Sequence, residues 1–266
     1  MQEILMFIAC MLAIIAISMM GAYVPYMRSL SDAQIHTLIA LSAGIFIGVL
    51  FFLLLPETIH ESEGKLSETQ TLAWILFGFL AVMTVEVMME AHHVKTCPCG
   101  HNYDEKEYDD HHHGIMSISA FVGLGIHACV DGLMLASAFY IAGGLGLVAL
   151  VGMCIHKFID SFSLSSTFLL SNRDKKSALR YLFVFALITP TSAVISNIAL
   201  NGMSFDGITG ISLSLSTGTF MYVALCGMLP EAFHREEQDI KSFVVLLTGI
   251  AIAAISFLLF GHSHTH

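Results

Sequence analysis

Long apolar segments alternate with short polar ones along the whole chain. A membrane-spanning helix needs about 20 mainly apolar residues to cross a hydrocarbon core of about 30 Å. Segments of this length recur eight times, and they cover residues 4–24, 36–56, 71–91, 115–141, 145–170, 178–200, 208–230 and 242–260. The pattern predicts an all-α integral membrane protein in which residues 1–266 form a single transmembrane domain.

Composition supports this prediction, and it indicates lipid contact and no nucleic-acid partner. Hydrophobic residues make up 56% of the 266 positions and charged residues only 12%, with a mean hydropathy of +0.77. Soluble domains are about 45–50% apolar and about 25% charged, so much of the apolar surface here faces lipid. The first segment is interpreted as a span, with a cleaved signal peptide as the alternative. The net charge of −10 comes from Asp and Glu in loops and does not indicate a nucleic-acid partner.

Basic residues predict the orientation in the membrane, because Lys and Arg concentrate in cytosolic loops. The loops after the first, third, fifth and seventh segments hold nine Lys and Arg residues, whereas Lys65 stands alone on the other side. We therefore expect both termini to be extracytoplasmic.

Two apolar segments each carry a histidine followed four residues later by an aspartate. These pairs are His127 with Asp131 and His156 with Asp160. A spacing of four places both side chains on one helix face, and both pairs fall near the middle of their segments. Two imidazoles and two carboxylates complete the tetrahedral shell that Zn²⁺ accepts. Fe²⁺, Mn²⁺, Co²⁺ and Cd²⁺ also fit this ligand set, so the metal is expected as a substrate, zinc first, with no resident cofactor.

The alternative for these pairs is a structural role, in which buried polar residues join helices by hydrogen bonds. An ionisable side chain at mid-membrane costs about 2.5–3.5 kcal/mol, and structure alone rarely requires this twice, which favours metal binding. Lys157 directly follows His156. It is either a structural ion-pair partner of Asp131 or Asp160, or an ammonium beside the metal that balances carboxylate charge.

The second and seventh segments share a motif of Gly, Phe, Leu, Pro, Glu and His at a constant offset of 174 residues. It ends in Leu-Pro-Glu57-x-x-His60 in one segment and in Leu-Pro-Glu231-x-x-His234 in the other. The two segments are predicted to run in opposite directions, and inverted repeats are typical of transporters. Convergent use of proline and glutamate at helix ends is the alternative. We expect Glu57 and His60 in an outer vestibule, and Glu231 and His234 in an inner one.

Further candidate ligands lie at the cytosolic side. Glu86 and Glu90 either line the exit or form an ordinary interfacial helix end. Residues 92–114 are expected to form a disordered cytosolic loop that binds exchangeable metal. Its candidate ligands are His92, His93, Cys97, Cys99, His101, His111, His112 and His113. The tail His262-x-His264-x-His266 is similar but short.

Together these motifs resemble those of the ZIP family (zinc/iron-regulated transporter-like proteins). The similarity covers all eight segments and is strongest to the small members of Golgi and plasma membranes, which also have lysine after the histidine of the fifth segment. It implies metal uptake toward the cytosol by alternating access. It also implies an eight-helix bundle with a 3+2+3 inverted-repeat arrangement, assembled as a homodimer.

Two departures from the family pattern bear on the site. Many members have Asn and an acidic residue where this chain has Ala128 and Lys157, which argues against a second metal ion. The proline common within both motifs is replaced by Val130 and Ile159, which leaves local unwinding open.

A metal exporter and a membrane-embedded metal hydrolase are the alternatives to a metal-uptake transporter. A metal exporter with paired His-x-x-x-Asp motifs would have six spans and a soluble C-terminal domain, unlike this chain. A membrane-embedded metal hydrolase would need an open metal position and a general base, as in His-Glu-x-x-His, and the sequence has no such motif. The chain is therefore predicted not to be an enzyme.

Overall fold

The computed structural model describes residues 2–27, 31–96, 105–142, 147–171, 174–200, 208–233 and 239–260. All regular structure in these residues is helical, with η1 a short 3₁₀ turn and η2 and η3 π-helical. The elements are α1 (Gln2–Tyr23), η1 (Val24–Tyr26), α2 (Asp32–Val49), η2 (Leu50–Leu54), α3 (Leu55–Ser62), α4 (Glu68–Thr96), α5 (Glu105–Ala142), α6 (Leu147–Leu170), α7 (Lys175–Leu200), α8 (Ile208–Tyr222), η3 (Val223–Met228), α9 (Leu229–Ala232) and α10 (Asp239–Phe260).

The eight predicted spans are all helical. Two of them are composite, because α2, η2 and α3 run on as one helix, and α8, η3 and α9 as another. Within the described residues, six stretches are long and apolar enough to cross a membrane, and Ile240–Ile255 is a shorter apolar helix. The six are Met6–Tyr26, Ala33–Ser62, Glu68–Met89, Ser117–Ala136, Lys175–Ile198 and Gly210–Ala232. The chain is therefore an all-α multi-pass membrane protein.

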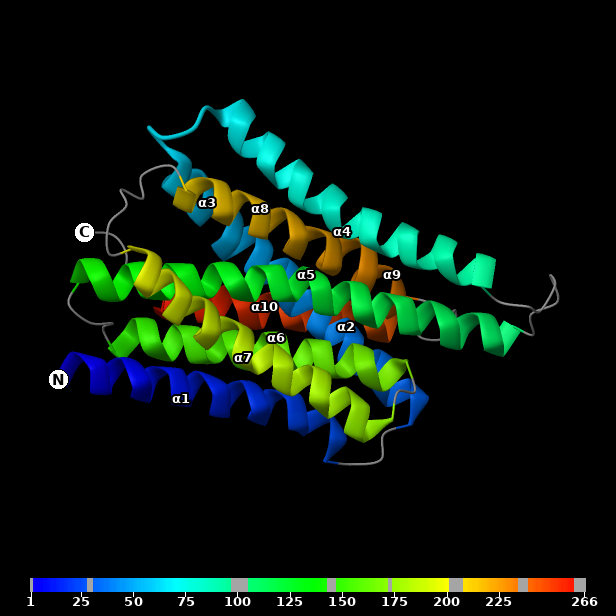
Figure 1. The fold of residues 1–266 in the computed structure, drawn as a ribbon. Helices are drawn as coiled ribbons and strands as arrows, with labels where there is room; N and C mark the ends of the chain where they lie inside the picture. The colour runs from blue at the N-terminus through cyan, green and yellow to red at the C-terminus, as the bar shows by residue number, and fades with distance from the viewer. Residues whose placement is uncertain are drawn as a thin grey trace.

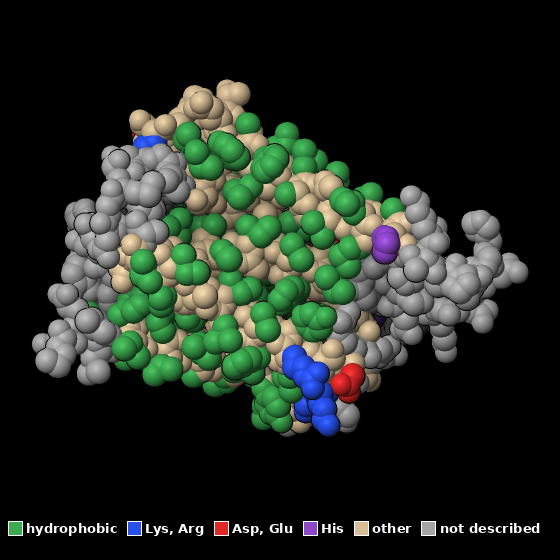
Figure 2. All heavy atoms as spheres, in the orientation of Figure 1, with side chains coloured by type: hydrophobic (Ala, Val, Ile, Leu, Met, Phe, Trp, Pro, Cys, Tyr) green, Lys and Arg blue, Asp and Glu red, His purple; other side chains and the backbone are tan. Residues whose placement is uncertain are grey.

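The surface of the bundle agrees with a lipid environment. Apolar side chains are spread over the visible face, and the few charged side chains lie in small groups near its margins (Figure 2). The outer faces of α4 and α10 are especially apolar, and both expose large hydrophobic side chains, among them Leu76, Phe77, Val87, Phe243 and Leu258. Such faces are stable in hydrocarbon because all backbone groups of a helix are satisfied internally.

The structure differs from the prediction of a disordered loop at residues 92–114. Helix α4 continues to Thr96, and α5 already begins at Glu105, ten residues before the predicted span. Acidic residues at the start of α5 favour this extension, because carboxylates interact well with the positive end of the helix dipole. Residues 97–104 lie outside the described part of the chain.

The helices lie side by side in one bundle, and α1 begins on the side where α10 ends (Figure 1). The most extensive contacts join α2 to α10, α4 to α8, α5 to α7 and α1 to α6. Helices α5 and α6 also contact each other, and they pack on α8 and α2, respectively. The α5–α6 pair thus packs against both composite helices.

Both composite helices contain a π-helical turn directly before the Leu-Pro-Glu motif. The Leu55 amide donates to the Leu50 carbonyl, five residues back, and the Leu229 amide donates to Ala224 in the same way. Pro56 and Pro230 lack an N–H, and their rings collide with the carbonyl four residues earlier in a regular α-helix. The wider turn removes this collision, so the repeated motif is accompanied by a repeated π-helical turn.

Glycines bring the composite helices close to their neighbours. A β-carbon at Gly44 would collide with the backbone of Leu246 on α10, and one at Gly218 would collide with the backbone of Ile75 on α4. Small residues allow such close approach, which provides the packing energy that joins helices in lipid. Two repeat positions therefore make equivalent contacts in the two halves of the bundle.

Candidate metal site

Helices α5 and α6 bring their two His-Asp pairs to one point. His127 Nε2 lies 2.9 Å from His156 Nε2 and 3.7 Å from Asp131 Oδ2. His156 Nε2 lies 3.7 Å from Asp131 Oδ2 and 3.5 Å from Asp160 Oδ2. One ligand atom from each residue lies within 4.8 Å of all the others. The structure therefore brings together the four residues predicted as metal ligands, on regular turns of two adjacent helices.

These separations suit a small divalent cation. Ligands about 2.1 Å from a tetrahedral zinc ion stand roughly 3.4 Å apart, which is close to the distances between these atoms. The His127 and Asp160 side chains are 1% exposed. Within the described residues, Asp160 Oδ1 is a buried acceptor with no hydrogen-bond partner. A buried group of two imidazoles and two carboxylates fits one metal ion.

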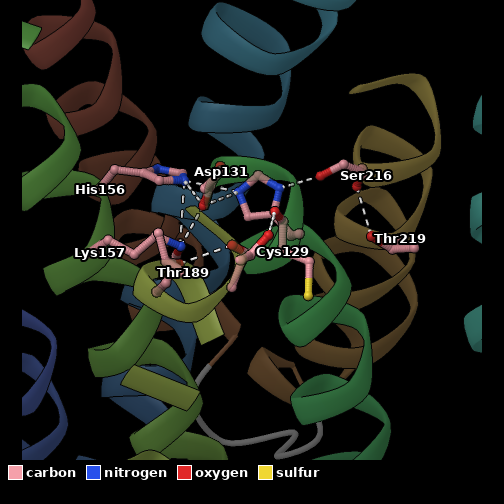
Figure 3. A network of polar contacts seen from close by, with 11 residues as sticks. Cys129, Asp131, His156, Lys157, Thr189, Ser216 and Thr219 are labelled. Atoms are coloured by element: carbon pink, nitrogen blue, oxygen red, sulfur yellow. Dashed lines mark hydrogen bonds and ion pairs between the residues drawn. The ribbon is translucent and has the colours of Figure 1, made fainter. Parts of the chain in front are cut away.

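The ammonium of Lys157 lies inside this group. It forms an ion pair with Asp131 Oδ2, and it donates to Asp160 Oδ2 at 3.3 Å (Figure 3). Its side chain is 2% exposed and lies near the ring of Phe185. The two interpretations drawn from the sequence therefore coincide, because Lys157 pairs with both carboxylates and also stands beside the candidate metal position. It offsets one of their two negative charges.

Helix α7 supports α5 at the level of the site. Thr189 Oγ1 donates to the Ala128 carbonyl at 3.0 Å, and Ser192 Oγ donates to the Cys129 carbonyl at 2.5 Å. A β-carbon at Gly132 would meet the backbone of α7 closely. Both α5 and α6 remain helical through their motifs. The absence of the prolines left open whether the helices unwind locally at the two motifs. The structure has continuous helix there.

Ser216 is a site residue that the sequence reasoning missed. Its Oγ lies 2.6 Å from His127 Nδ1, and its side chain points toward the site (Figure 3). Thr219 Oγ1 donates to the Ser216 carbonyl one turn further along α8. The signal was present in the repeat, which extends two residues upstream of Gly218 to include this serine.

The predicted vestibule residues lie apart from the four-residue group. Glu57 and His60 are exposed on α3. Glu231 is buried on α9, where its Oε1 lies 3.5 Å from Nδ1 of His36, a residue that was not anticipated. His234 lies outside the described residues.

The remaining candidates are on α4 and α5. Glu86 accepts a hydrogen bond of 2.5 Å from Ser119 Oγ, and His92 is exposed. The side chains of Glu90, His93, Cys97, Cys99, His101, His111, His112 and His113 lie outside the described part of the chain.

Comparison with known proteins gives a consistent result. The model of the ZIP zinc transporter family matches residues 4–113 and 90–256. Zinc transporter ZIP9-B of Xenopus laevis is 23% identical over 300 residues, covering 92% of this chain and 95% of the relative. Zinc transporter ZIP1 of Danio rerio is 24% identical over 255 residues, covering 82% and 83%. Zinc transporter ZupT of Clostridium perfringens is 32% identical over 87 residues, covering 33% and 30%.

Proposed function

The chain belongs to the ZIP zinc transporter family, and from this premise we propose that it carries zinc through a single mid-membrane site. It is a membrane transporter of divalent metal ions, and not an enzyme. The ion is its substrate. In this proposal His127, Asp131, His156 and Asp160 hold the ion, and Lys157 balances carboxylate charge when the site is empty.

The observation that carries the proposal is the convergence of the four ligand atoms within 4.8 Å of one another. Their nitrogen and oxygen donors suit zinc and also fit Fe²⁺, Mn²⁺, Co²⁺ and Cd²⁺. The names of the relatives favour zinc among these ions.

We further propose a 3+2+3 arrangement, in which the first three spans repeat as the last three in inverted direction. Helix packing supports it. If the first, second and third spans are matched with the sixth, seventh and eighth, and the fourth with the fifth, the α2–α10 contact corresponds to α8–α4. In the same way α5–α7 corresponds to α6–α1, and α5–α8 corresponds to α6–α2. Two related halves around a central site are suited to alternating access.

The distribution of basic residues supports extracytoplasmic termini, with α3 at the outer face and α9 at the inner face. In this orientation Glu57 and His60 serve the outer mouth, Glu231 and His234 the inner mouth, and Glu86 and Glu90 the exit. Metal moves toward the cytosol across a plasma membrane or a Golgi-type membrane, and the functional unit is a homodimer, as the family resemblance implies.

Zinc uptake into liposomes that contain the purified protein tests the site. Replacing His127, Asp131, His156 or Asp160 with alanine removes a ligand, so each variant should insert normally and lose transport. Thr248→Ala, which changes an exposed residue on α10 whose hydroxyl donates to the Val244 carbonyl of its own helix, is the control and should transport at the wild-type rate. If any two of the four variants transported zinc at wild-type rates, the site assignment would be wrong.

A further inference from the structure

A buried serine on α8 holds one of the two metal-site histidines. Ser216 is completely buried, His127 is 1% exposed, and Ser216 Oγ lies 2.6 Å from His127 Nδ1. The neutral His127 ring can bind a metal through Nε2 only if its one proton is on Nδ1. The Nδ1–H group then donates to the Ser216 oxygen. A bond of this kind fixes both the tautomer and the orientation of a ligating imidazole.

The repeat provides a second serine in the equivalent position. Leu41-Ser42-x-Gly44-x-Phe46 corresponds to Leu215-Ser216-x-Gly218-x-Phe220 at the offset of 174 residues. Ser42 lies on α2, which packs on α6 as α8 packs on α5. By this correspondence, Ser42 is the residue of α2 that matches Ser216 of α8, and His156 is the histidine of α6 that matches His127 of α5.

The two serines differ in their hydrogen bonds. Ser42 is completely buried, and its Oγ has no hydrogen-bond partner in the described part of the chain. In the described residues His156 contacts His127, Asp131 and Asp160 through Nε2. A buried hydroxyl without a partner is costly, and a native structure normally provides one in some state.

Aromatic rings of the same repeat connect the two serine positions. Phe220 lies 4.9 Å from the ring of His127, and Phe46 lies 4.5 Å from Phe220. Both phenylalanines are completely buried. The two composite helices therefore contact each other, and one of them contacts His127, at the level of the site.

We propose that Ser216 and Ser42 are positioning residues that act in alternation on the two metal-binding histidines. In the state described here, Ser216 orients His127. In the state that faces the other side of the membrane, Ser42 Oγ accepts a hydrogen bond from His156 Nδ1–H, and the Ser216–His127 bond opens. The inference rests on the proposed alternating access, and it adds that each state has its own oriented histidine.

Transport kinetics from each side of the membrane test this inference. In liposomes that hold the transporter in one orientation, Ser216→Ala should raise the half-saturating zinc concentration about tenfold on one face and less than twofold on the other, as expected for loss of a supporting bond to a metal ligand. Ser42→Ala should show the opposite preference, and the double variant should be impaired on both faces.

Ser214→Ala is the matched control, because Ser214 is buried on α8 and donates to the Gly210 carbonyl of its own helix. It should leave both faces unchanged. Binding of Co²⁺, followed by its visible absorption, should weaken in Ser216→Ala but not in Ser214→Ala, while the unfolding temperatures of the two metal-free variants remain equal.

Three results would overturn the inference. They are wild-type kinetics in both single variants, an equal change on both faces in either one, and an effect of Ser214→Ala as large as that of Ser216→Ala. Failure of the proposed function is distinguishable, because then the wild-type protein would not transport zinc, or it would do so without His127.

Discussion

The two composite helices, α2–η2–α3 and α8–η3–α9, have similar backbone features but differ in the surroundings of their side chains. Each has a glycine against a neighbouring backbone and a π-helical turn before a proline. Yet Glu57 is exposed, whereas the equivalent Glu231 is 4% exposed and lies beside His36. Similarly, Ser216 bonds to a histidine, and Ser42 has no partner among the described residues.

The asymmetry between the two composite helices therefore arises from the packing around the repeat and not from the repeated residues themselves. The glutamates and serines are the same residue types at matching positions, so their environments distinguish them. A carrier that opens to one side of the membrane at a time is expected to show this asymmetry. In any one state, equivalent groups of its two halves have different surroundings.

The largest expected effect comes from breaking the shared backbone contacts. Gly44→Leu and Gly218→Leu should each abolish recovery of folded protein, because the added side chain meets the backbone of a packed helix, and overpacking costs about 1–3 kcal/mol or more. Size-exclusion chromatography of detergent extracts measures this recovery.

Gly125→Ala is the control for these two variants, since a β-carbon there would lie 3.5 Å from Ile188 Cδ1, an ordinary contact. It should fold normally. A folded, active Gly44→Leu beside an unfolded Gly218→Leu would show that the two contacts are not equivalent.

A smaller effect is expected from the two repeat glutamates. Glu231→Gln removes a buried carboxylate charge 3.5 Å from His36 Nδ1 and should slow transport about tenfold, as expected when a buried ion pair is broken. Glu57→Gln changes an exposed group and should slow transport about twofold or less. Initial rates of zinc uptake in liposomes measure both, and equal rates in the two variants would contradict the asymmetry.

The α5–α6 pair shows a second asymmetry, because Ala128 follows one histidine and Lys157 follows the other. The ammonium between Asp131 and Asp160 should exclude a second divalent ion, so we expect one metal per site. Lys157→Asp should admit a second ion or slow turnover by leaving excess negative charge. Anomalous scattering at the zinc edge counts the ions, and two strong peaks a few ångströms apart in the unmodified protein would refute the single-ion site.

The smallest effect is expected from the histidine-rich connection, which lies outside both composite helices. Deleting residues 96–112 should leave zinc transport in liposomes within about twofold of wild type, because this polar segment lies outside the predicted spans. We expect this segment to act in regulation and in the release of metal in the cytosol. Complete loss of transport in a well-inserted deletion variant would place the connection in the pathway.

Local periodicity explains what the sequence could predict. Apolar length located the eight helices, and the spacing of four residues placed His127 with Asp131 and His156 with Asp160 on single helix faces. Their convergence could be expected because both pairs lie at similar depth. These features depend on residues close together in the chain.

Contacts between distant helices explain what was missed. The His36–Glu231 pair and the Ser216–His127 bond join residues 195 and 89 positions apart. The bridging position of Lys157 depends on how α6 rotates against α5, which composition does not determine. The early start of α5 was missed because polar residues that favour a loop are also compatible with a helix once a neighbouring span has nucleated it.

The π-helical turns also bear on the history of the chain. A turn of this kind holds one residue more than an α-helical turn, so it is what a single-residue insertion leaves in a helix. The turns at 50–54 and 223–228 coincide within one residue when the offset of 174 is applied. The proposed inverted repeat accounts for this coincidence, because one residue inserted before a duplication would be passed on to both halves, whereas separate insertions would have had to fall at the same place. On that proposal the extra residue is older than the duplication.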